Sequence, residues 1–284
     1  IIKGTNLILS KRKCDEILEE YKTLTEQNSK YVTFIGPNPV SMGLDTLNIE
    51  NPHSILQGYV VTEKADGIRA QLFIDKIGEC WLITQKKEII YTGSRVKNNS
   101  LFGSCILDGE YIQSDRNNKD IQLFMIFDIY YSENGEYPNH PHTFPWLGKK
   151  KNDLCRSTIL YDFKLKVEII TSDISSLRNG VYSYLWTKEN QNIDGKDVIR
   201  IGFKKYYEGP KLLKKDKKNP NIYTNEKGIC KVSKKILDFD KKEAYEYNID
   251  GLIYLPMYYS VTSSSDSFVK DSINGTWLEN YKWK

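Results

Sequence analysis

The chain has 284 residues, of which 39% are hydrophobic, 12% aromatic and 27% charged. This is the composition of an ordinary globular protein with enough apolar residues for a full core, and it excludes a largely disordered chain. Forty-one basic residues against 37 acidic ones give a net charge of only +4, so the overall charge does not indicate nucleic-acid binding.

The cysteines number five and are widely spread, with no CxxC pair, and only three histidines accompany them. This pattern argues against a zinc cluster or a disulfide framework and favours a reducing compartment. No apolar run reaches the roughly 20 residues that a membrane-spanning helix needs, and the first residues lack a signal-peptide pattern. We therefore expect a cytosolic protein. Because the sequence begins without Met and stops on the strand-like "YKWK", we also expect a segment of a longer chain.

The first predicted element is a helix that packs on the rest of the protein. Ser10 is a suitable N-cap for it. Apolar residues then repeat at helical spacing up to the polar stretch "EQNSK", and they are Cys14, Ile17, Leu18, Tyr21 and Leu24.

From residue 59 the pattern changes to short β-type runs separated by polar turns. In chain order these runs are "YVVTE", "AQLFI", "CWLITQ", "EIIYTG", "SCILDGEYI" and "IQLFMIFDIYY". Residues 132–160 are rich in Pro, Gly, Asn and Lys and predict a loop or insertion, whereas residues 174–190 are compatible with a helix. "DVIRIGFKKYY" at 197–207, "NIDGLIYLP" and "GTWLENYKWK" add further strand-like runs. Strands dominate, so we predict an α+β fold built on antiparallel sheet.

Lys64 is the residue that fits this strand pattern least. It stands in "EKADGIR", between the apolar runs "GYVVTE" and "AQLFI", and a lysine is costly to bury unless it is paired or used. An exposed turn at "DG" would explain the stretch without any function. A lysine can also be a nucleophile toward phosphorus, but only when deprotonated. A free lysine has a pKa of about 10.4, so burial or neighbouring cations would have to favour the neutral amine.

Five motifs in order bear on this choice: "EKADGIR", "LDGEYI", "MIFDIY", "IDGLIY" and the terminal "KWK". Together they resemble the motifs of the covalent nucleotidyltransferases, which are the mRNA capping enzymes and the ATP-dependent polynucleotide ligases. The resemblance covers residues 64–284. It implies an ATP-grasp-like α+β fold of antiparallel sheets with flanking helices, with a helical lead-in at 1–58 packed on a catalytic domain at 59–284. We do not expect the family's C-terminal OB-fold lid within this chain.

The resemblance implies a role for each motif, with Lys64 as the nucleophile that forms a lysyl–NMP phosphoramidate. Asp250, together with Glu110, would hold Mg²⁺ or Mn²⁺, ions that carboxylate oxygens suit. Arg95 of "YTGSRV" would contact the ribose, and Phe127 would stack on the purine. The residues expected to bind the nucleotide are Asp66, Gly67, Arg69, Arg95, Glu110, Phe127, Lys282 and Lys284.

Several of these residues also have an interpretation without function. Arg95 would suit a surface, Glu110 a solvated strand and Phe127 a core. Lys282 and Lys284 stand two apart, so in a strand they would share a face that meets the α-phosphate.

Finer marks favour capping over ligation. "LDGEYI" and "KWK" look more like capping guanylyltransferases, and "GPNPVSMG" before "YVVTEKADG" is similar to the lead-in of capping enzymes from large DNA viruses of the giant-virus, asfarvirus and poxvirus type. The resemblance then implies GTP as substrate and 5′-diphosphate RNA as acceptor. It also implies triphosphatase and methyltransferase domains as partners in the full-length protein, no membrane partner, and a location in the host cytoplasm (the viral factory) and the virion.

Two alternatives stay open from the sequence. One is the adenylation domain of an ATP-dependent polynucleotide ligase, and the other is a catalytically inactive RNA-binding module. The basic stretches "KKYYEGPKLLKKDKK" and "KVSKK" could guide RNA through salt-sensitive phosphate contacts or could be solvated surface.

Overall fold

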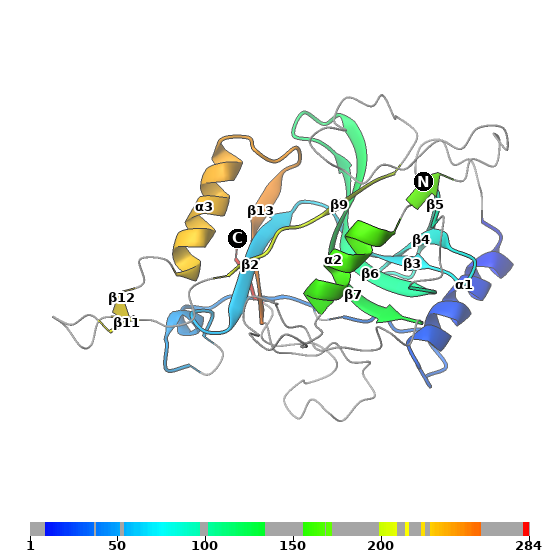
Figure 1. Cartoon of the computed structure of the whole chain (residues 1–284), viewed down its shortest axis with the longest axis horizontal. Coiled ribbons are helices and arrows are strands. Elements are labelled where there is room, and N and C mark those ends of the chain that lie inside the picture. The colour runs from blue at the N-terminus through cyan, green and yellow to red at the C-terminus, as the bar shows by residue number, and fades with distance from the viewer. Residues whose placement is uncertain are drawn as a thin grey trace. The chain divides into compact units, whose positions relative to one another are not determined.

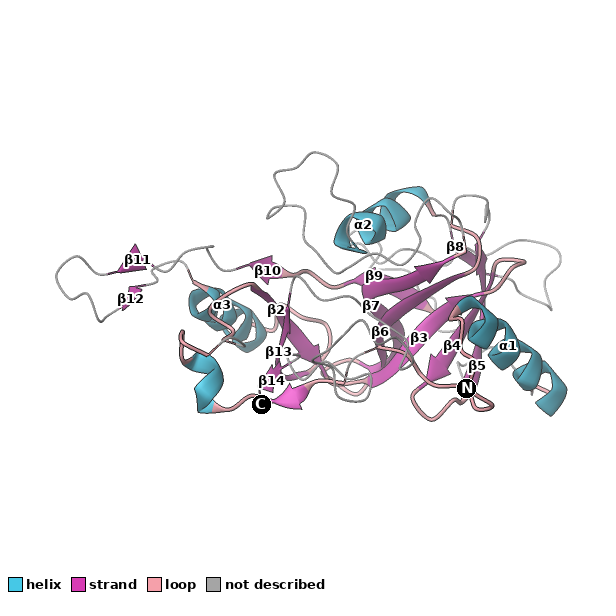
Figure 2. Cartoon of the chain, turned by 90° about the horizontal axis from the view of Figure 1, so that it is seen from below, coloured by secondary structure: helices cyan, strands magenta, loops and turns pink. Residues whose placement is uncertain are grey.

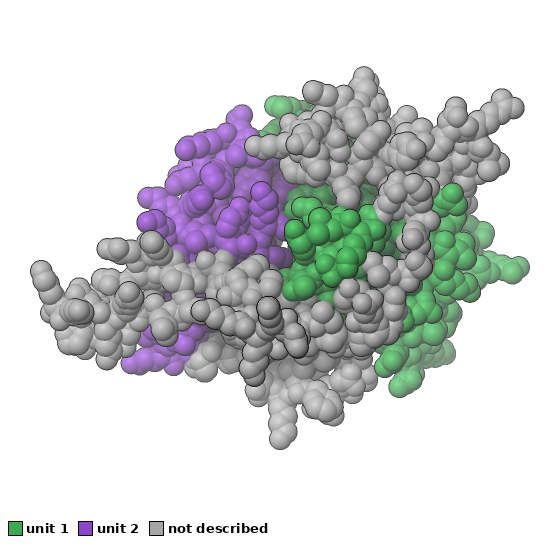
Figure 3. All heavy atoms as spheres, in the orientation of Figure 1, with its two compact units in different colours: residues 1–36, 67–203, 260–268 green, residues 37–66, 204–259, 269–284 purple. Residues whose placement is uncertain are grey.

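The structure, a computed structural model, describes residues 9–36, 38–51, 54–96, 102–133, 156–167, 169–171, 199–208, 214–215, 223–224, 228–256 and 281–283. The chain divides into two compact units (Figure 3). Unit 1 consists of residues 1–36, 67–203 and 260–268, and unit 2 of residues 37–66, 204–259 and 269–284. The lead-in expected at 1–58 is thus shared between the units, and the predicted boundary at residue 58 stays a prediction.

Unit 1 is built around a seven-stranded sheet with the strand order β8-β5-β4-β3-β6-β7-β9 (Figure 1). All neighbouring strands are antiparallel except β7 and β9. The strands are β3 (Ile68–Ile74), β4 (Glu79–Thr84), β5 (Ile89–Val96), β6 (Cys105–Ser114), β7 (Asp120–Ser132), β8 (Ile169–Thr171) and β9 (Arg200–Phe203).

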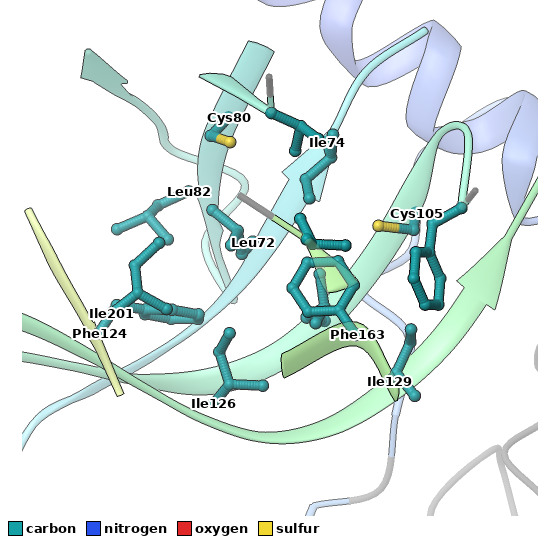
Figure 4. Close-up of a cluster of buried hydrophobic side chains, with 14 of the residues drawn as sticks. Leu72, Ile74, Cys80, Leu82, Cys105, Phe124, Ile126, Ile129, Phe163 and Ile201 are labelled. Atoms are coloured by element: carbon teal, nitrogen blue, oxygen red, sulfur yellow. The ribbon is translucent and has the colours of Figure 1, made fainter. Parts of the chain in front are cut away.

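Each face of this sheet carries a helix. Alternate residues of the strands point to opposite faces, and both sets are apolar, so both faces are covered. Helix α1 (Lys11–Leu24) is capped at its N-terminus by Ser10 as the sequence predicts, and the Ser10 side chain accepts a hydrogen bond from the backbone N–H of Lys13. It packs through Ile17 and Tyr21 on one face. Helix α2 (Arg156–Lys166) packs on the other (Figure 2). The apolar cluster between α2 and the sheet, part of which is drawn in Figure 4, includes Leu72, Ile74, Leu82, Phe124, Ile126, Ile129 and Ile201 and, from α2 itself, Ile159 and Phe163.

Unit 2 contains a five-stranded sheet with the order β1-β14-β13-β2-β10, in which only β1 and β14 run parallel. Its strands are β1 (Val40–Ser41), β2 (Tyr59–Ala65), β10 (Tyr207–Glu208), β13 (Ile249–Pro256) and β14 (Tyr281–Trp283). Helix α3 (Ile229–Lys241) packs on one face through Ile229 and Ile236. The short helix η1 (Leu44–Leu47) and the ribbon of β11 (Lys214–Lys215) and β12 (Tyr223–Thr224) complete the unit's regular structure in the part of the chain that is described.

The α+β class and the antiparallel strands of the sequence prediction are confirmed. The stretch 197–207 forms two strands in two sheets, not one. The loop predicted over 132–160 is wrong at its end, because α2 begins at Arg156. Helix α3 was not predicted, since its apolar residues are interleaved with lysines. The helix expected at 174–190 lies outside the described residues, and none of the described helices is long and apolar enough to cross a membrane.

The cysteines offer a test of this fold. Of the four cysteines in the described part of the chain, Cys80 and Cys105 are buried in unit 1, Cys14 is partly exposed and Cys230 is exposed. Burial raises the pKa of both buried thiols, and the thiolate is the reactive form. Of these four, we expect iodoacetamide at neutral pH to modify Cys230 first and Cys14 more slowly, and to reach Cys80 and Cys105 only after unfolding. Peptide mass spectrometry with and without guanidinium measures this order, and rapid modification of Cys80 in the folded protein would contradict the described core.

Candidate active site

Lys64 and Asp250 meet on adjacent strands of unit 2. The Lys64 Nζ donates a hydrogen bond to Oδ1 of Asp250 over 2.5 Å, from β2 to β13. The two side chains keep 22% and 34% of their surface exposed. The amine is therefore partly buried, paired with a carboxylate and still reachable from solvent.

A bulge in β13 brings these two residues together. Ile249 pairs with Ala65 and Leu252 pairs with Glu63, so Asp250 and Gly251 together stand opposite Lys64. A bulge of this kind places two residues against one and re-aims the neighbouring side chain. Gly251 has a φ of +138°, a backbone conformation that only glycine adopts at little cost. The "DG" of "IDGLIY" is thus the sequence of the bulge that turns Asp250 toward the lysine.

The two faces of β2 differ in what they contact. Tyr59 and Val61 face α3 within the apolar cluster of unit 2, and Lys64 lies on the opposite face because side chains alternate along a strand. Glu63 is buried on the α3 face, where its carboxylate accepts hydrogen bonds from the hydroxyls of Tyr247 (2.9 Å) and Thr62 (2.8 Å). The lysine that looked out of place in the sequence thus lies on the face of β2 opposite the apolar cluster of unit 2.

The carbonyl that precedes Lys64 is held by a second lysine. The buried Lys204 donates a hydrogen bond from Nζ to the backbone oxygen of Glu63 over 3.2 Å. In the antiparallel pair of β2 and β10, Tyr207 faces Val61. Lys204 comes three residues before Tyr207, next to the end of this ladder, and its side chain supplies a donor to the β2 backbone there.

Asp66 and Gly67 form the exposed turn between β2 and β3. The backbone N–H of Asp66 donates to the carbonyl of Asn248 over 2.9 Å. A Cβ atom added to Gly67 would lie 2.8 Å from both Cγ of Glu110 and the carbonyl oxygen of Tyr111. Glycine at 67 is therefore required for this turn to approach β6, which gives the "DG" of the first motif a packing reason.

Arg69 is held by Asp108 inside unit 1. The guanidinium donates from Nη2 to Oδ2 over 2.6 Å and from Nε to Oδ1 over 3.3 Å, with 13% of the arginine side chain exposed. The hydroxyl of Tyr130 also donates to Oδ2, over 2.5 Å. Burial raises the pKa of the Asp108 carboxyl, and the Arg69 charge opposes this rise. The ring of Phe34 lies 5.5 Å from the guanidinium carbon, on a cation–π contact.

Glu110 and Phe127 come from the paired strands β6 and β7. Glu110 is partly buried and stands opposite Arg69 in the β3–β6 register. In the β6–β7 register, Asp108 pairs with Asp128 and Gly109 with Ile126, so Phe127 is the extra residue of a bulge. Phe127 is only partly buried although both of its chain neighbours are buried. Because Phe127 is the extra residue of the bulge, its side chain does not follow the regular alternation of side chains between the two faces of the strand.

The three remaining basic candidates are Arg95 on β5, Lys282 on β14 and Lys284. Arg95 is exposed on β5, opposite Glu79. Position 282 of β14 pairs with Ile253 of β13, and Ile253 pairs with Thr62 of β2, which places Lys282 in the same row of the sheet as a residue two before Lys64. Lys284 lies outside the described residues.

The candidates therefore form one group in each unit. In unit 2 the sheet assembles Lys64, Asp250 and position 282, and in unit 1 it assembles Arg69, Glu110 and Phe127. Among the described residues, no three His, Cys, Asp or Glu side chains gather as a metal-binding group. The individual nucleotide contacts stay predictions.

Residues 3–152 match the family model described as the mRNA capping enzyme, catalytic domain. This chain belongs to that family. A probable mRNA-capping enzyme of Acanthamoeba polyphaga mimivirus is 31% identical over 147 residues, which are 48% of this chain and 11% of that protein. The resemblance to capping enzymes of large DNA viruses is thereby confirmed. A solved structure named "Pmar-Lig_PreS3" aligns with 97% of this chain and 51% of its own, at 11% identity and a TM-score of 0.44.

The capping-enzyme match includes some candidates and not others. It takes in those of the first three motifs and Arg95, but it ends before Asp250 and the terminal lysines. For Asp250, the geometry beside Lys64 is the independent observation.

The sequence motifs gave no role to Asp108, Tyr130, Arg156 or Lys204. The signal for Asp108 was its place inside a strand, where aspartate is depleted and a buried one requires a partner. The same signal marks Asp128, whose partner is Arg156.

The Arg69–Asp108 pair predicts a difference between two arginines of this capping-enzyme domain. In Arg69→Met the Asp108 carboxylate stays buried without its cation, so the free energy of unfolding should fall by about 3–5 kcal/mol. Arg95→Met is the matched control, since removal of an exposed side chain should change it by less than about 0.5 kcal/mol. Urea unfolding followed by circular dichroism measures both. Equal stability of the two variants would mean that Asp108 does not depend on Arg69.

Proposed function

We propose that this protein is the guanylyltransferase of an mRNA capping enzyme. It takes GMP from GTP onto Lys64 and passes it to the 5′-diphosphate end of RNA. The observation that carries the proposal is the Lys64 amine, held by Asp250 across the β13 bulge in a chain of the capping-enzyme family. The mimivirus relative, a probable mRNA-capping enzyme, supports GTP chemistry over ligation.

In the first step the neutral amine of Lys64 attacks GTP. A bond forms from Nζ to the α-phosphorus, and the bond from that phosphorus to the bridging oxygen of the pyrophosphate breaks. The nitrogen gives up a proton, and the products are lysyl-GMP and pyrophosphate. Catalysis of such a transfer rests mainly on positioning. Here β13 and the hydrogen bond from Lys204 to the preceding carbonyl hold the backbone of the nucleophile.

In the second step a terminal phosphate oxygen of the RNA attacks the same phosphorus. The bond from phosphorus to Nζ breaks, the amine of Lys64 regains a proton, and a triphosphate bridge joins GMP to the RNA. Lys64 thus returns to its starting state.

The residues present fit Mg²⁺ or Mn²⁺ at Asp250. This side chain offers a carboxylate that keeps a third of its surface exposed, and Mg²⁺ is commonly held through one or two carboxylates together with substrate phosphates. Such an ion, when bound, neutralises charge on the α-phosphate. The Asp250 carboxylate already lies against Nζ of Lys64. An ion bound to this carboxylate would therefore hold the phosphate close to the nucleophile. Glu110 is the second proposed carboxylate.

The nucleoside is assigned to residues of unit 1. Phe127, presented by its bulge, would stack on the guanine, and Glu110 would orient the sugar. Arg69 and Arg95 would contact the nucleotide from β3 and β5, and Asp66 and Gly67 from the turn that follows Lys64. Lys282 and Lys284 would meet the α-phosphate.

The RNA acceptor and the partner domains complete the proposal. The two basic stretches named above would guide the RNA by phosphate contacts that weaken with salt. The matched segment is 11% of the mimivirus protein, and we propose triphosphatase and methyltransferase domains beside this one in the full-length protein. The proposed location is the cytoplasm of the host and the virion.

Covalent labelling tests the nucleophile and the nucleotide together. A protein that contains this chain should take up label from α-labelled GTP and not from ATP, and the bond should be acid-labile and alkali-stable as a phosphoramidate. Lys64→Arg should abolish the label, because a guanidinium stays protonated and does not attack. Denaturing gel electrophoresis measures the bound label.

Lys76→Arg is the control, since Lys76 is an exposed lysine of unit 1. It should label as the unmodified protein does. Label from ATP would assign the protein to the ligases, label in Lys64→Arg would refute the nucleophile, and no label from either nucleotide would favour an inactive RNA-binding module.

Two variants should separate the metal carboxylate from the base contact. Asp250→Ala should raise the Mg²⁺ or Mn²⁺ concentration needed for labelling, because an oxygen ligand is lost. Phe127→Leu should weaken GTP binding by about 1–3 kcal/mol with the metal dependence unchanged, and Phe127→Tyr should bind as the unmodified protein does because the ring remains. Metal titrations of labelling and calorimetric GTP titrations measure the two effects. Equal affinity of the leucine and tyrosine variants would argue against stacking.

A further inference from the structure

A buried ion pair lies next to Phe127 and has no part in the proposed chemistry. Asp128 follows Phe127 in β7 and pairs with Arg156, the first residue of α2. The arginine donates from Nε to Oδ1 over 2.9 Å and from Nη2 to Oδ2 over 3.1 Å, and each side chain is 2% exposed. Removing two charges from water is expensive, and apolar residues often replace such a pair without loss of stability. The pair therefore calls for a reason other than stability.

The pair sits where β7 departs from regular pairing. Phe127 and Tyr130 are two of the extra residues that interrupt the register of β7 with β6. Asp128 stands between them and also accepts the backbone N–H of Ile129 over 2.8 Å. A bulged strand lacks part of its ladder of hydrogen bonds and bends locally. The bidentate contact of Arg156 with Asp128 fixes a backbone that the sheet alone holds less firmly.

Arg156 also contacts the second bulge. Its guanidinium carbon lies 5.8 Å from the centre of the Tyr130 ring, and the Tyr130 hydroxyl bonds to Asp108, the partner of Arg69. One side chain of α2 therefore contacts both Tyr130 and Asp128, the residue that follows Phe127. The arginine fork is planar and rigid, so it sets orientation as well as distance.

We propose that Arg156 is a positioning residue for the nucleotide, which through Asp128 and Tyr130 fixes the bulged part of β7 so that the Phe127 ring is preset for the base. The inference rests on the proposed function for the role of Phe127. It assigns to α2 a task in substrate binding that the motifs of the sequence do not contain.

Two variants separate positioning from folding. Arg156→Lys keeps a charge but loses the fork. The double variant Asp128→Leu with Arg156→Met replaces the pair by apolar side chains of similar volume, a change that is often neutral for stability. We expect both variants to bind GTP about tenfold more weakly, because part of the stacking contact with the base is lost. The labelling rate at saturating GTP should stay unchanged, because Lys64 lies outside this network.

Asp162→Asn is the matched control on the same helix. It removes the more exposed ion pair of Asp162 with Lys166 at 3.4 Å, and such pairs contribute little. It should leave GTP affinity and melting temperature unchanged. Melting temperatures of all variants, calorimetric Kd values for GTP and single-turnover labelling form the comparison.

Hydrogen exchange gives a second measurement that needs no nucleotide. In Arg156→Lys the amides of residues 126–131 should exchange faster, while those of the β3–β4 pair should not change. Unchanged exchange in β7, or an unchanged Kd for GTP in a folded double variant, overturns the inference and leaves the proposed function intact. An unmodified protein that neither binds GTP nor takes label overturns the proposed function, and with it the nucleotide role of Arg156.

Discussion

The candidate site in unit 2 depends on the unequal pairing of β2 with β13. In a regular strand, residues 250, 252 and 254 would share one face. Leu252 and Tyr254 belong to the apolar cluster beneath α3, and so does Ile249 at its edge. Only because β13 has one residue more than β2 between the paired positions can Asp250 leave that face and reach Lys64 on the other. A register change of one residue exchanges the two faces of a strand, and here the bulge exchanges the faces of Ile249 and Asp250 relative to the rest of β13.

In unit 1, two buried carboxylates are held by ion pairs and not by a bulge that joins two strands. The carboxylates of Asp108 and Asp128 are fully buried, and each is matched by one guanidinium through two hydrogen bonds. Tyr130 lies between the pairs and contacts both. Buried polar groups are tolerable only when they are satisfied, and a satisfied network is rigid. A nucleotide carries its own charge into a site, so a surface that receives it gains from cations and aromatic rings that are already fixed.

What the sequence could predict followed from local pattern. Ser10 and the helical spacing after it give α1, and alternation gives β2 to β7, because these signals lie within a few residues of each other. The closeness of Lys64 and Asp250 came from the order of the motifs and not from any pattern, since the two are 186 positions apart. The bulges at Phe127 and Gly251 escaped prediction because one inserted residue hardly alters an apolar run. Helix α2 was missed because it opens with a buried arginine whose partner lies 28 positions earlier.

The division of the chain also bears on how it is made. Each unit is assembled from three separate stretches, so no single cut of the backbone separates the two. Strand β2 is synthesised by residue 65, yet its neighbour β13 begins at Ile249 and β14 only at Tyr281. Contacts between such distant segments form slowly and late. On the ribosome, Lys64 must therefore wait for most of the chain before Asp250 can reach it, and a chain that terminates early leaves β2 without this partner and with an edge that other nascent proteins can pair with.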